Sequence, residues 1–313
     1  MKSVRLGKGG PKVSEIGLGM WQAGGTAWGA DVTDDACVAA MQRAHELGVT
    51  LIDTAEGYGA GHSEEVVGRA VKEIGRDDVV IATKVAGSHL REDLVPRACE
   101  ASLRRLGVSE IDLYQIHWPD PWDQNPLRRT MRALERLHKE GKIRHIGVSN
   151  FAVRDLEEAR AILSRADIVE NQIYWSLLHR TVEEEVAPYC AKEGIAVLPW
   201  SPLDKGLLTG KYHAGRKPED EVRKGGKNFR DENLAEIGKL VAVLKEVGDK
   251  HGKSPGQVAL NWLMRQAGTV VPIPGAKNPA QAEENAGAAG WTLADGEVRR
   301  ISDASASLTL DLF

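Results

Sequence analysis

The sequence is poor in the features that mark secreted, membrane-spanning and disulfide-rich proteins. It has three cysteines among 313 residues, and Cys37, Cys99 and Cys190 lie too far apart to suggest a disulfide framework or a metal-ligand spacing. No apolar run approaches the roughly 18 residues that a membrane helix needs, and residues 1–5 lack the apolar core of a secretory signal. We therefore expect a cytoplasmic protein with no membrane contact.

The charge also lacks a strong bias toward one sign. Lysine and arginine number 41, aspartate and glutamate number 45, and the formal net charge is −4. Without a basic excess, nothing indicates a nucleic-acid partner. We expect a monomer, because no interaction segment stands out. The apolar fraction of 42% and charged fraction of 27% are ordinary for a globular protein with a sizeable core.

Short runs of β-branched and aliphatic residues alternate with helical stretches along the whole chain. After a hairpin in residues 2–15, the expected strands are residues 16–19, 49–52, 79–83, 111–116, 144–148, 168–172, 195–200 and 269–273. The expected helices are residues 33–47, 63–72, 94–106, 127–139, 153–163, 182–192, 234–250, 255–266 and 279–286.

Eight strand–helix units of roughly 25–35 residues each favour a closed barrel over an open sheet. The sequence therefore predicts an α/β protein, a (β/α)8 TIM barrel with an N-terminal β-hairpin, as one domain over residues 1–313. Extra helices and a long loop rich in Lys, Arg and Gly, residues 203–233, follow the seventh strand. Loops of this length are often functional lids.

Polar side chains stand where three successive expected strands end. These residues are Asp53, Lys84 and His117, and Tyr58 follows five residues after Asp53 in a glycine-rich loop. Taken singly, they read as a strand cap, a solvated lysine, a core histidine and an exposed tyrosine. In a (β/α)8 barrel the active site lies at the carboxyl ends of the strands, so together they predict an ionisable cluster at that rim.

The four side chains suit proton donation to a carbonyl oxygen. A phenol has a pKa near 10, and we expect Lys84 to lower it so that Tyr58 donates a proton near neutral pH. Asp53 is expected to hold Lys84, and neutral His117 to orient the carbonyl group. Protonation is half of a reduction, and the hydride must come from a cofactor because no side chain supplies one.

A metal-dependent (β/α)8 hydrolase is an alternative for the same strand ends, with Asp53 and His117 as ligands. The chain has no His-x-His strand end, and Lys84 would repel a cation. We therefore expect no metal.

A set of motifs stands in one order along the chain. The motifs are Asp53-Thr54-Ala55-Glu56-Gly57-Tyr58-Gly59, Thr83-Lys84, Ile116-His117-Trp118, Gly147-Val148-Ser149-Asn150-Phe151, Asn171-Gln172, Trp200-Ser201-Pro202-Leu203 and Pro272-Ile273-Pro274-Gly275-Ala276-Lys277. Over nearly its whole length the chain resembles the aldo-keto reductases, most of all the bacterial branch that also resembles potassium-channel β subunits.

The resemblance implies a catalytic tetrad, Asp53, Tyr58, Lys84 and His117, with Tyr58 as general acid. It also implies a nicotinamide dinucleotide across the barrel mouth, in agreement with the lack of a G-x-G-x-x-G after a strand. The implied cofactor contacts are Ser149, Asn150 and Gln172 at the carboxamide, Trp200 beneath the nicotinamide, Ser201, Leu203, Gly206 and Leu207 along the pyrophosphate, Gly275 and Lys277 at a phosphate, Gln281 at a position linked to NADP specificity, and Glu284 and Asn285 at the adenine.

The cofactor implied in this way is NADPH, because Lys277 resembles the 2′-phosphate contact. Two residues depart from the family pattern. Trp200 stands where Tyr is commoner, and Gln281 stands where many NADP-specific members carry Arg, which leaves some use of NADH open.

Tryptophans gather in the loops after the expected first and fourth strands. Trp21, Trp28 and Trp118 are expected to line an apolar pocket for aromatic or aliphatic carbonyl substrates, whereas Trp122 is explained equally well by loop packing. An alternative function is a cofactor-binding, redox-sensing regulatory protein with slow turnover, like the channel β subunits.

Overall fold

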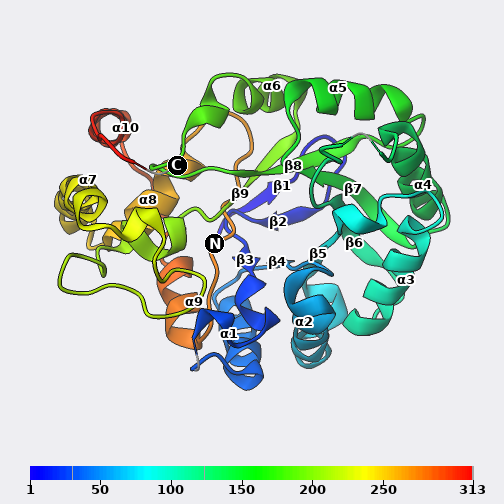
Figure 1. Ribbon diagram of the computed structural model, residues 1–313, viewed down its shortest axis with the longest axis horizontal. Coiled ribbons are helices and arrows are strands. Elements are labelled where there is room, and N and C mark those ends of the chain that lie inside the picture. The colour runs from blue at the N-terminus through cyan, green and yellow to red at the C-terminus, as the bar shows by residue number, and fades with distance from the viewer. Residues whose placement is uncertain (30, 123, 312–313) are drawn as a thin grey trace.

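Parallel strands form the centre of the molecule. The structure is a computed structural model that describes residues 1–29, 31–122 and 124–311. The central strands are β3 (Leu18–Gly19), β4 (Leu51–Asp53), β5 (Val80–Val85), β6 (Ile111–Ile116), β7 (Ile143–Ser149), β8 (Ile168–Tyr174) and β9 (Ala196–Trp200). All pair in parallel with their neighbours in chain order, and helices surround them (Figure 1).

Residues 269–275 complete the barrel between β9 and β3. Val271 and Ile273 donate backbone N–H groups to Val197 and Pro199 of β9, at 2.9 and 3.1 Å. On the other side, Gly17 and Gly19 donate to the carbonyl oxygens of residues 272 and 274, at 2.9 and 3.1 Å. The predicted strand at 269–273 is present only as bridged extended backbone, because residues 272 and 274 are prolines and have no N–H for the ladder. The predicted (β/α)8 barrel is confirmed.

The helices cover the outside of the barrel with their apolar faces inward. They are α1 (Asp34–Glu46), α2 (His62–Ile74), α3 (Val95–Leu106), α4 (Leu127–Lys139), α5 (Val153–Ile162), α6 (Val186–Glu193), α7 (Asp231–His251), α8 (Pro255–Met264), α9 (Pro279–Ala286) and α10 (Asp295–Ala306). In α4, for example, Met131, Leu134 and Leu137 are buried at helical spacing. Among the described residues, no helix combines the length and the apolarity needed to span a bilayer.

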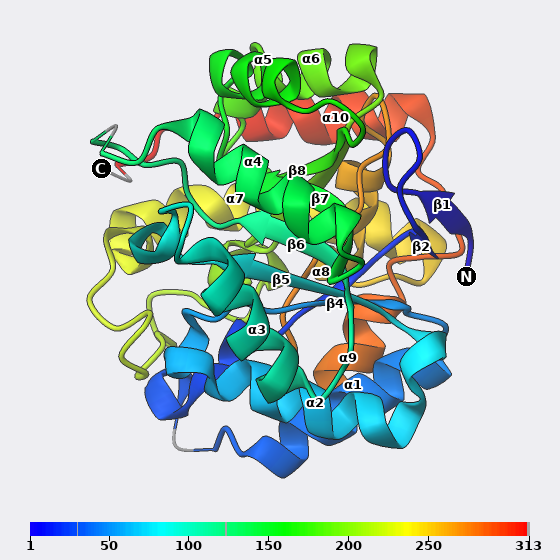
Figure 2. The same cartoon turned by 90° about the vertical axis from the view of Figure 1, so that its right-hand side faces the viewer.

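The hairpin of β1 (Ser3–Arg5) and β2 (Lys12–Ser14) closes the amino end of the barrel. Leu6 and Val13 beside its strands are buried in the barrel interior, in one cluster with Leu51 and Leu113. The hairpin and the long loop before α7 lie at opposite ends of the molecule (Figure 2). The carboxyl ends of the strands therefore stay open for a ligand. The three cysteines are buried and unpaired, as packing residues are expected to be.

Candidate active site

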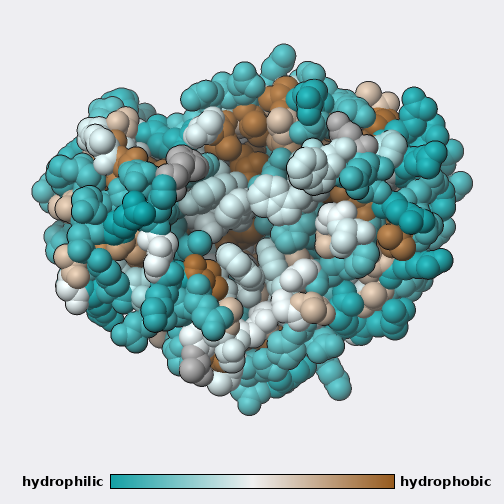
Figure 3. Space-filling view, in the orientation of Figure 1, coloured by the Kyte–Doolittle hydropathy of each residue, from teal (hydrophilic) through white to brown (hydrophobic). Residues whose placement is uncertain are grey.

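A cavity of about 710 Å³ opens at the carboxyl ends of the strands, a size typical of ligand sites. It is visible as the central hollow of Figure 3, where pale and brown residues are ringed by hydrophilic ones. The predicted site residues that line it are Trp21, Trp28, Asp53, Tyr58, His117, Trp118, Ser149, Asn150, Gln172, Trp200, Ser201, Leu203, Gly206, Gly275, Lys277, Gln281, Glu284 and Asn285. Sequence positions from Trp21 to Asn285 thus meet around one cavity.

Asp53 at the cavity floor forms an ion pair with Lys84 beneath it. The distance from Lys84 Nζ to Asp53 Oδ1 is 2.7 Å, and their side chains are 0% and 3% exposed. Lys84 Nζ also donates to the Thr54 carbonyl oxygen at 2.8 Å and to the Tyr58 hydroxyl oxygen at 3.3 Å. Burial lowers the pKa of Lys84, but the neighbouring Asp53 and Tyr58 outweigh burial and raise that pKa above its usual value. Lys84 therefore holds Tyr58 with a charged donor.

The loop after β4 aims Tyr58 at this lysine. Gly59 adopts φ 60°, and a Cβ there would lie 2.1 Å from the Gly24 carbonyl oxygen, so only glycine permits the close contact between the two loops. Glu56 ties the same loop to the next one, because its Oε1 accepts from the Ala86 N–H at 2.6 Å. The conformation that presents Tyr58 is therefore specified by its glycine-rich neighbours.

One expectation about Tyr58 is wrong. Lys84 was expected to lower its pKa, but burial, together with the charge of Asp53, outweighs Lys84 and raises the pKa of Tyr58 above 10. An ammonium has three N–H donors and no acceptor. In the Lys84–Tyr58 contact the phenol oxygen is therefore the acceptor. The phenol hydrogen thus stays on Tyr58 and can be donated to a ligand.

His117 is neutral, as expected. Burial and the charge of Lys84 lower the pKa of His117 to about 3. Its ring meets that of Tyr58 edge to face, with centroids 5.5 Å apart. The two side chains therefore offer two neutral hydrogen-bonding groups at the same end of the cavity.

Two glutamines complete the surroundings of Asp53. Its Oδ2 accepts from Gln172 Nε2 at 2.8 Å and from Gln115 Nε2 at 3.2 Å, and Gln172 also donates to Gln115 Oε1 at 3.0 Å. Gln172 was predicted as a cofactor contact, and its amide nitrogen is already engaged within the protein. Gln115 was not predicted, although it stands two residues before His117 on β6 and faces the same way.

Glu170 lies deeper in the barrel, two residues before Gln172 on β8. It is fully buried, and within the described part of the chain no side chain hydrogen-bonds either carboxyl oxygen. A Cβ on Gly147 would lie 1.9 Å from Glu170 Oε1, so this glycine makes room for the side chain. Burial and the charge of Asp53 raise the pKa of Glu170 well above its usual range, which makes it a neutral acid.

An aromatic stack forms one wall of the cavity. Trp200 stacks on Tyr174 with ring centroids 4.4 Å apart, and Tyr174 stacks on His179 at 4.1 Å. The Trp200 indole N–H donates to Asn150 Oδ1 at 3.0 Å, and Asn150 Nδ2 donates to Ser149 Oγ at 2.9 Å. Tyr174 covers one face of Trp200, which leaves the other face for a flat ligand.

The segment after β9 turns sharply along the same wall. Ser201, Asp204 and Lys205 have positive φ values of 49°, 46° and 55°, an unusual run for residues other than glycine. The Asp204 carboxylate anchors this turn by accepting from the hydroxyl groups of Tyr174 and Ser176. Burial raises the pKa of Asp204 to about 6. Leu207, a predicted contact, is buried in the apolar core and does not line the cavity.

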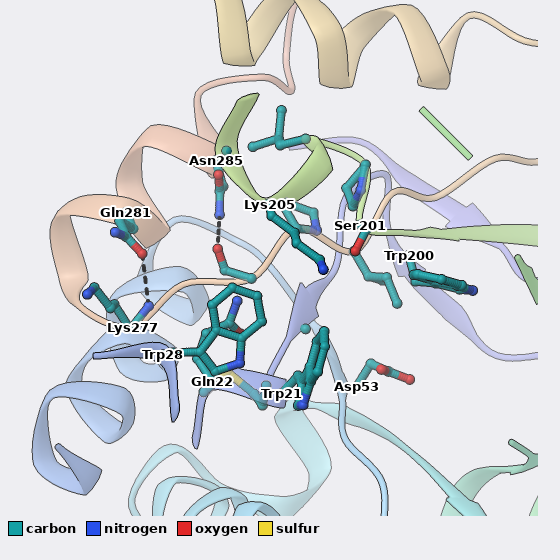
Figure 4. Close-up of a pocket in the computed structure, with 18 of the residues that line it drawn as sticks. Trp21, Gln22, Trp28, Asp53, Trp200, Ser201, Lys205, Lys277, Gln281 and Asn285 are labelled. Carbon is teal, nitrogen blue, oxygen red and sulfur yellow. Dashed lines mark hydrogen bonds between the residues drawn. The ribbon is translucent and has the colours of Figure 1, made fainter. Parts of the chain in front are cut away.

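The other end of the cavity is formed by residues 275–285 (Figure 4). A Cβ on Gly275 would lie 2.0 Å from Gln22 Nε2, so the chain passes close to its neighbour there. Asn285 Nδ2 donates to the Gly275 carbonyl oxygen at 3.1 Å, and Gln281 Oε1 accepts from the Lys277 N–H at 3.1 Å. Figure 4 shows Lys277 at the opposite end of the site from Asp53 and Trp200.

Cations that the site prediction missed line this end as well. Lys205, Lys211 and Arg223 come from the long loop after β9. Burial and the nearby charges of Arg223 and Lys277 lower the pKa of Lys211 to about 8. The sequence feature that indicates these cations is the excess of Lys and Arg in residues 203–233, for which only a lid is predicted above. A phosphate-bearing ligand would find a cationic wall here.

The tryptophans behave differently from one another. Trp21 packs edge to face on Trp28, with centroids 4.9 Å apart, and lies over Tyr58 at 6.1 Å. Trp118 approaches Trp200 at 6.4 Å, and all three predicted tryptophans line the cavity. Trp122 is 78% exposed and stays outside it.

Fold and site together define a class of protein: a (β/α)8 barrel with a buried cluster of ionisable side chains at one end of a cavity and cations at the other. A family model described as Aldo/keto reductase family matches residues 15–306. The chain belongs to this family of oxidoreductases.

Individual relatives agree with the family assignment. The chain is 37% identical to aldo-keto reductase YhdN of Bacillus subtilis (strain 168), over 96% of this chain and 93% of the relative. It is 32% identical to the NADH-specific methylglyoxal reductase of Escherichia coli (strain K12), over 98% and 99%. A crystal structure of an aldo/keto reductase from Klebsiella pneumoniae in complex with NADP and acetate superposes with a TM-score of 0.75 at 30% identity, over 99% of this chain and 100% of that one.

Proposed function

We propose that the protein reduces aldehydes or ketones to alcohols with NADPH, and that Tyr58 donates the proton. The observation that carries this proposal is the triple contact of the buried Lys84 ammonium with Asp53, the Thr54 carbonyl and the Tyr58 oxygen. This contact leaves a neutral phenol facing a large cavity. The membership of an oxidoreductase family supports the same reaction class.

The residues around the cavity fit a nicotinamide dinucleotide. At one end, the Ser149–Asn150 pair offers amide and hydroxyl groups beside the open face of Trp200. In the middle and at the far end, Lys205, Lys211 and Lys277 provide positive charge for phosphate groups. The closely packed Gly275 brings the backbone itself to the cavity surface.

In the proposed mechanism each side chain of the tetrad has one task. When bound, the reduced nicotinamide supplies the hydride that no side chain can supply. Tyr58 donates its hydroxyl hydrogen to the carbonyl oxygen while Lys84 stabilises the resulting phenolate by charge and hydrogen bond. Asp53 keeps the Lys84 ammonium in place. Neutral His117 hydrogen-bonds the carbonyl oxygen and orients it toward Tyr58.

The surroundings of Asp53 do not suit the metal site that the hydrolase alternative requires. Both carboxylate oxygens of Asp53 are engaged, one by Lys84 and the other by Gln115 and Gln172. An ammonium 2.7 Å from the carboxylate competes directly with any cation. Among the described residues, no group of three or more His, Cys, Asp and Glu side chains is placed to hold a metal ion.

The preference for NADPH is proposed from Lys277, the cation at the end of the cavity away from Tyr58. One solved relative was crystallised with NADP and another relative is named NADH-specific, so relatives of both kinds are similar to this chain. For the carbonyl compound, we propose an aromatic or aliphatic substrate held by Trp21, Trp28 and Trp118 above Tyr58.

The test is NADPH oxidation by the purified protein with a panel of aldehydes, ketones and quinones, with and without a chelator. Turnover that ignores the chelator and disappears in Tyr58→Phe supports the proposal. Turnover that requires a metal contradicts it. Tight NADPH binding with no multiple turnover on any compound would favour a redox-sensing regulatory role instead.

A further inference from the structure

Lys277, which lines the end of the cavity away from Tyr58, forms an ion pair with Asp31, which reaches it from outside the cavity lining. Lys277 Nζ lies 2.8 and 2.7 Å from the two carboxylate oxygens of Asp31. Lys277 stands in the turn before α9, and Asp31 in the loop just before α1. Their side chains are 18% and 70% exposed, so the lysine is largely enclosed while the aspartate reaches it from the solvent side.

This pairing matters because a carboxylate and a phosphate present the same kind of group to an ammonium. Two anionic oxygens of Asp31 already take the place on Lys277 that a 2′-phosphate would take. A carboxylate beside the ribose is also the group with which many NAD-binding sites accept a hydrogen bond from the 2′-hydroxyl. Lys277 thus suits one form of the cofactor and Asp31 the other.

We propose that Asp31 sets the balance between NADPH and NADH, by competing with the 2′-phosphate for Lys277 and by accepting a hydrogen bond from the ribose 2′-hydroxyl of NADH. This inference rests on the proposed function, because it requires a nicotinamide dinucleotide in this cavity. The family resemblance implies only that Lys277 contacts the 2′-phosphate. Asp31 is a second residue that competes with the phosphate for this lysine.

Asp31 reduces the preference for NADPH but does not exclude NADPH. An ion pair with one largely exposed partner is weak, so a phosphate can displace it. Two further cations lie around the pair: Arg223, itself paired with Asp220, acts on Asp31, and Lys211 lies near Lys277. With Asp31 displaced, a 2′-phosphate would still meet several positive groups. The expected result is a protein that uses both cofactors, with a modest preference for NADPH.

The test is the affinity of the wild-type protein and of Asp31→Asn for NADPH and NADH, followed by quenching of tryptophan fluorescence without any carbonyl substrate. Asp31→Asn removes the competing charge and is expected to tighten NADPH binding about threefold to fivefold at low salt, with NADH unchanged or weaker. The difference should shrink in 0.5 M salt because screening weakens exposed charge pairs. Lys277→Ala should weaken NADPH far more than NADH.

Asp35→Asn is the matched control. Asp35 is 89% exposed, lies four residues away and pairs with Arg69 at 2.6 Å on the outside of the barrel. Asp35→Asn removes the same charge without affecting a contact of Lys277, so the ratio of NADPH affinity to NADH affinity should stay within twofold of wild type. An unchanged ratio in Asp31→Asn, or an equal shift in Asp35→Asn, would overturn the role of Asp31. If the wild-type protein binds neither dinucleotide, the proposed function itself fails.

Discussion

Lys84 and Asp53 face each other at 2.7 Å at the cavity floor, and neither side chain is more than 3% exposed. A buried ion pair is retained at a large desolvation cost, so it calls for a functional reason. Here the reason is visible in the third contact of Lys84, which holds the Tyr58 oxygen at 3.3 Å. The ion pair therefore connects the strand ends to the Tyr58 phenol, which faces the cavity.

Removing the Tyr58 hydroxyl should abolish most carbonyl reduction. Tyr58→Phe keeps the ring but deletes the proton donor, and loss of general acid catalysis lowers kcat by about 100- to 10,000-fold. The measurement is NADPH oxidation at saturating carbonyl. Fluorescence titration with NADPH serves as the control, since the cofactor contacts proposed for Trp200 and Lys277 are untouched. Retained activity would rule out Tyr58 as the acid.

The pH dependence of reduction should be flat around neutrality. The pKa of His117 is about 3, so this residue does not titrate between pH 5 and 9. The pKa of Tyr58 lies above 10, so the phenol keeps its proton over the same range and loses it only in strong base. We expect kcat, measured at saturating cofactor and substrate, to show no transition near 6.5. A clear transition there that persists in Asp204→Asn, which removes the wall carboxyl group with a pKa of about 6, would contradict the neutral state of His117.

Glu170→Gln should stabilise the protein increasingly as the pH rises. The pKa of Glu170 is raised in the folded state, so above pH 4.5 the unfolded chain releases a proton that the folded chain keeps. The contribution of Glu170 to the free energy of unfolding is at its maximum below pH 4.5. It declines by up to about 1.4 kcal/mol per pH unit until the pH reaches the pKa of Glu170 in the folded protein. A neutral glutamine removes the decline.

Urea unfolding at pH 5, 7 and 8 measures this effect. The gap between Glu170→Gln and wild type should widen with pH, whereas Glu157→Gln, an exposed change on α5, should leave the pH dependence unaltered. A constant gap would show that Glu170 is ionised in the folded protein.

Loss of the Tyr174 hydroxyl should loosen the turn after β9. Tyr174→Phe leaves the buried Asp204 carboxylate with Ser176 as its remaining side-chain partner, and an unsatisfied buried group costs about 1–3 kcal/mol. Because the same ring supports Trp200, we expect lower thermal stability together with several-fold weaker cofactor binding. Tyr189→Phe on α6, away from the cavity, is the control and should change neither cofactor affinity nor the Trp200 stack. Unchanged cofactor affinity in Tyr174→Phe would show that the hydrogen bond from Tyr174 to Asp204 is not needed for binding.

The sequence alone determined the order of the strands and of the helices up to α9, and placed Asp53, Lys84 and His117 at strand ends with Tyr58 in the loop after the first of them; it did not predict α10. Each of these depends on local patterns, since an apolar run makes a strand and the residue after it lies at the barrel rim wherever the strand is placed. The prolines at 272 and 274 explain why the last expected strand is only partly hydrogen-bonded, although the barrel still closes.

Only the tertiary structure determined which distant residues are in contact and how deeply each ionisable group is buried. Asp31 and Lys277 are 246 residues apart, and nothing in either segment predicts that they meet. The contact of Gln115 with Asp53, and the stack of Tyr174 on Trp200, likewise depend on neighbouring strands. The pKa of Tyr58 followed burial and not the nearby lysine, because desolvation depends on everything that packs around a group, and the local sequence does not show that packing.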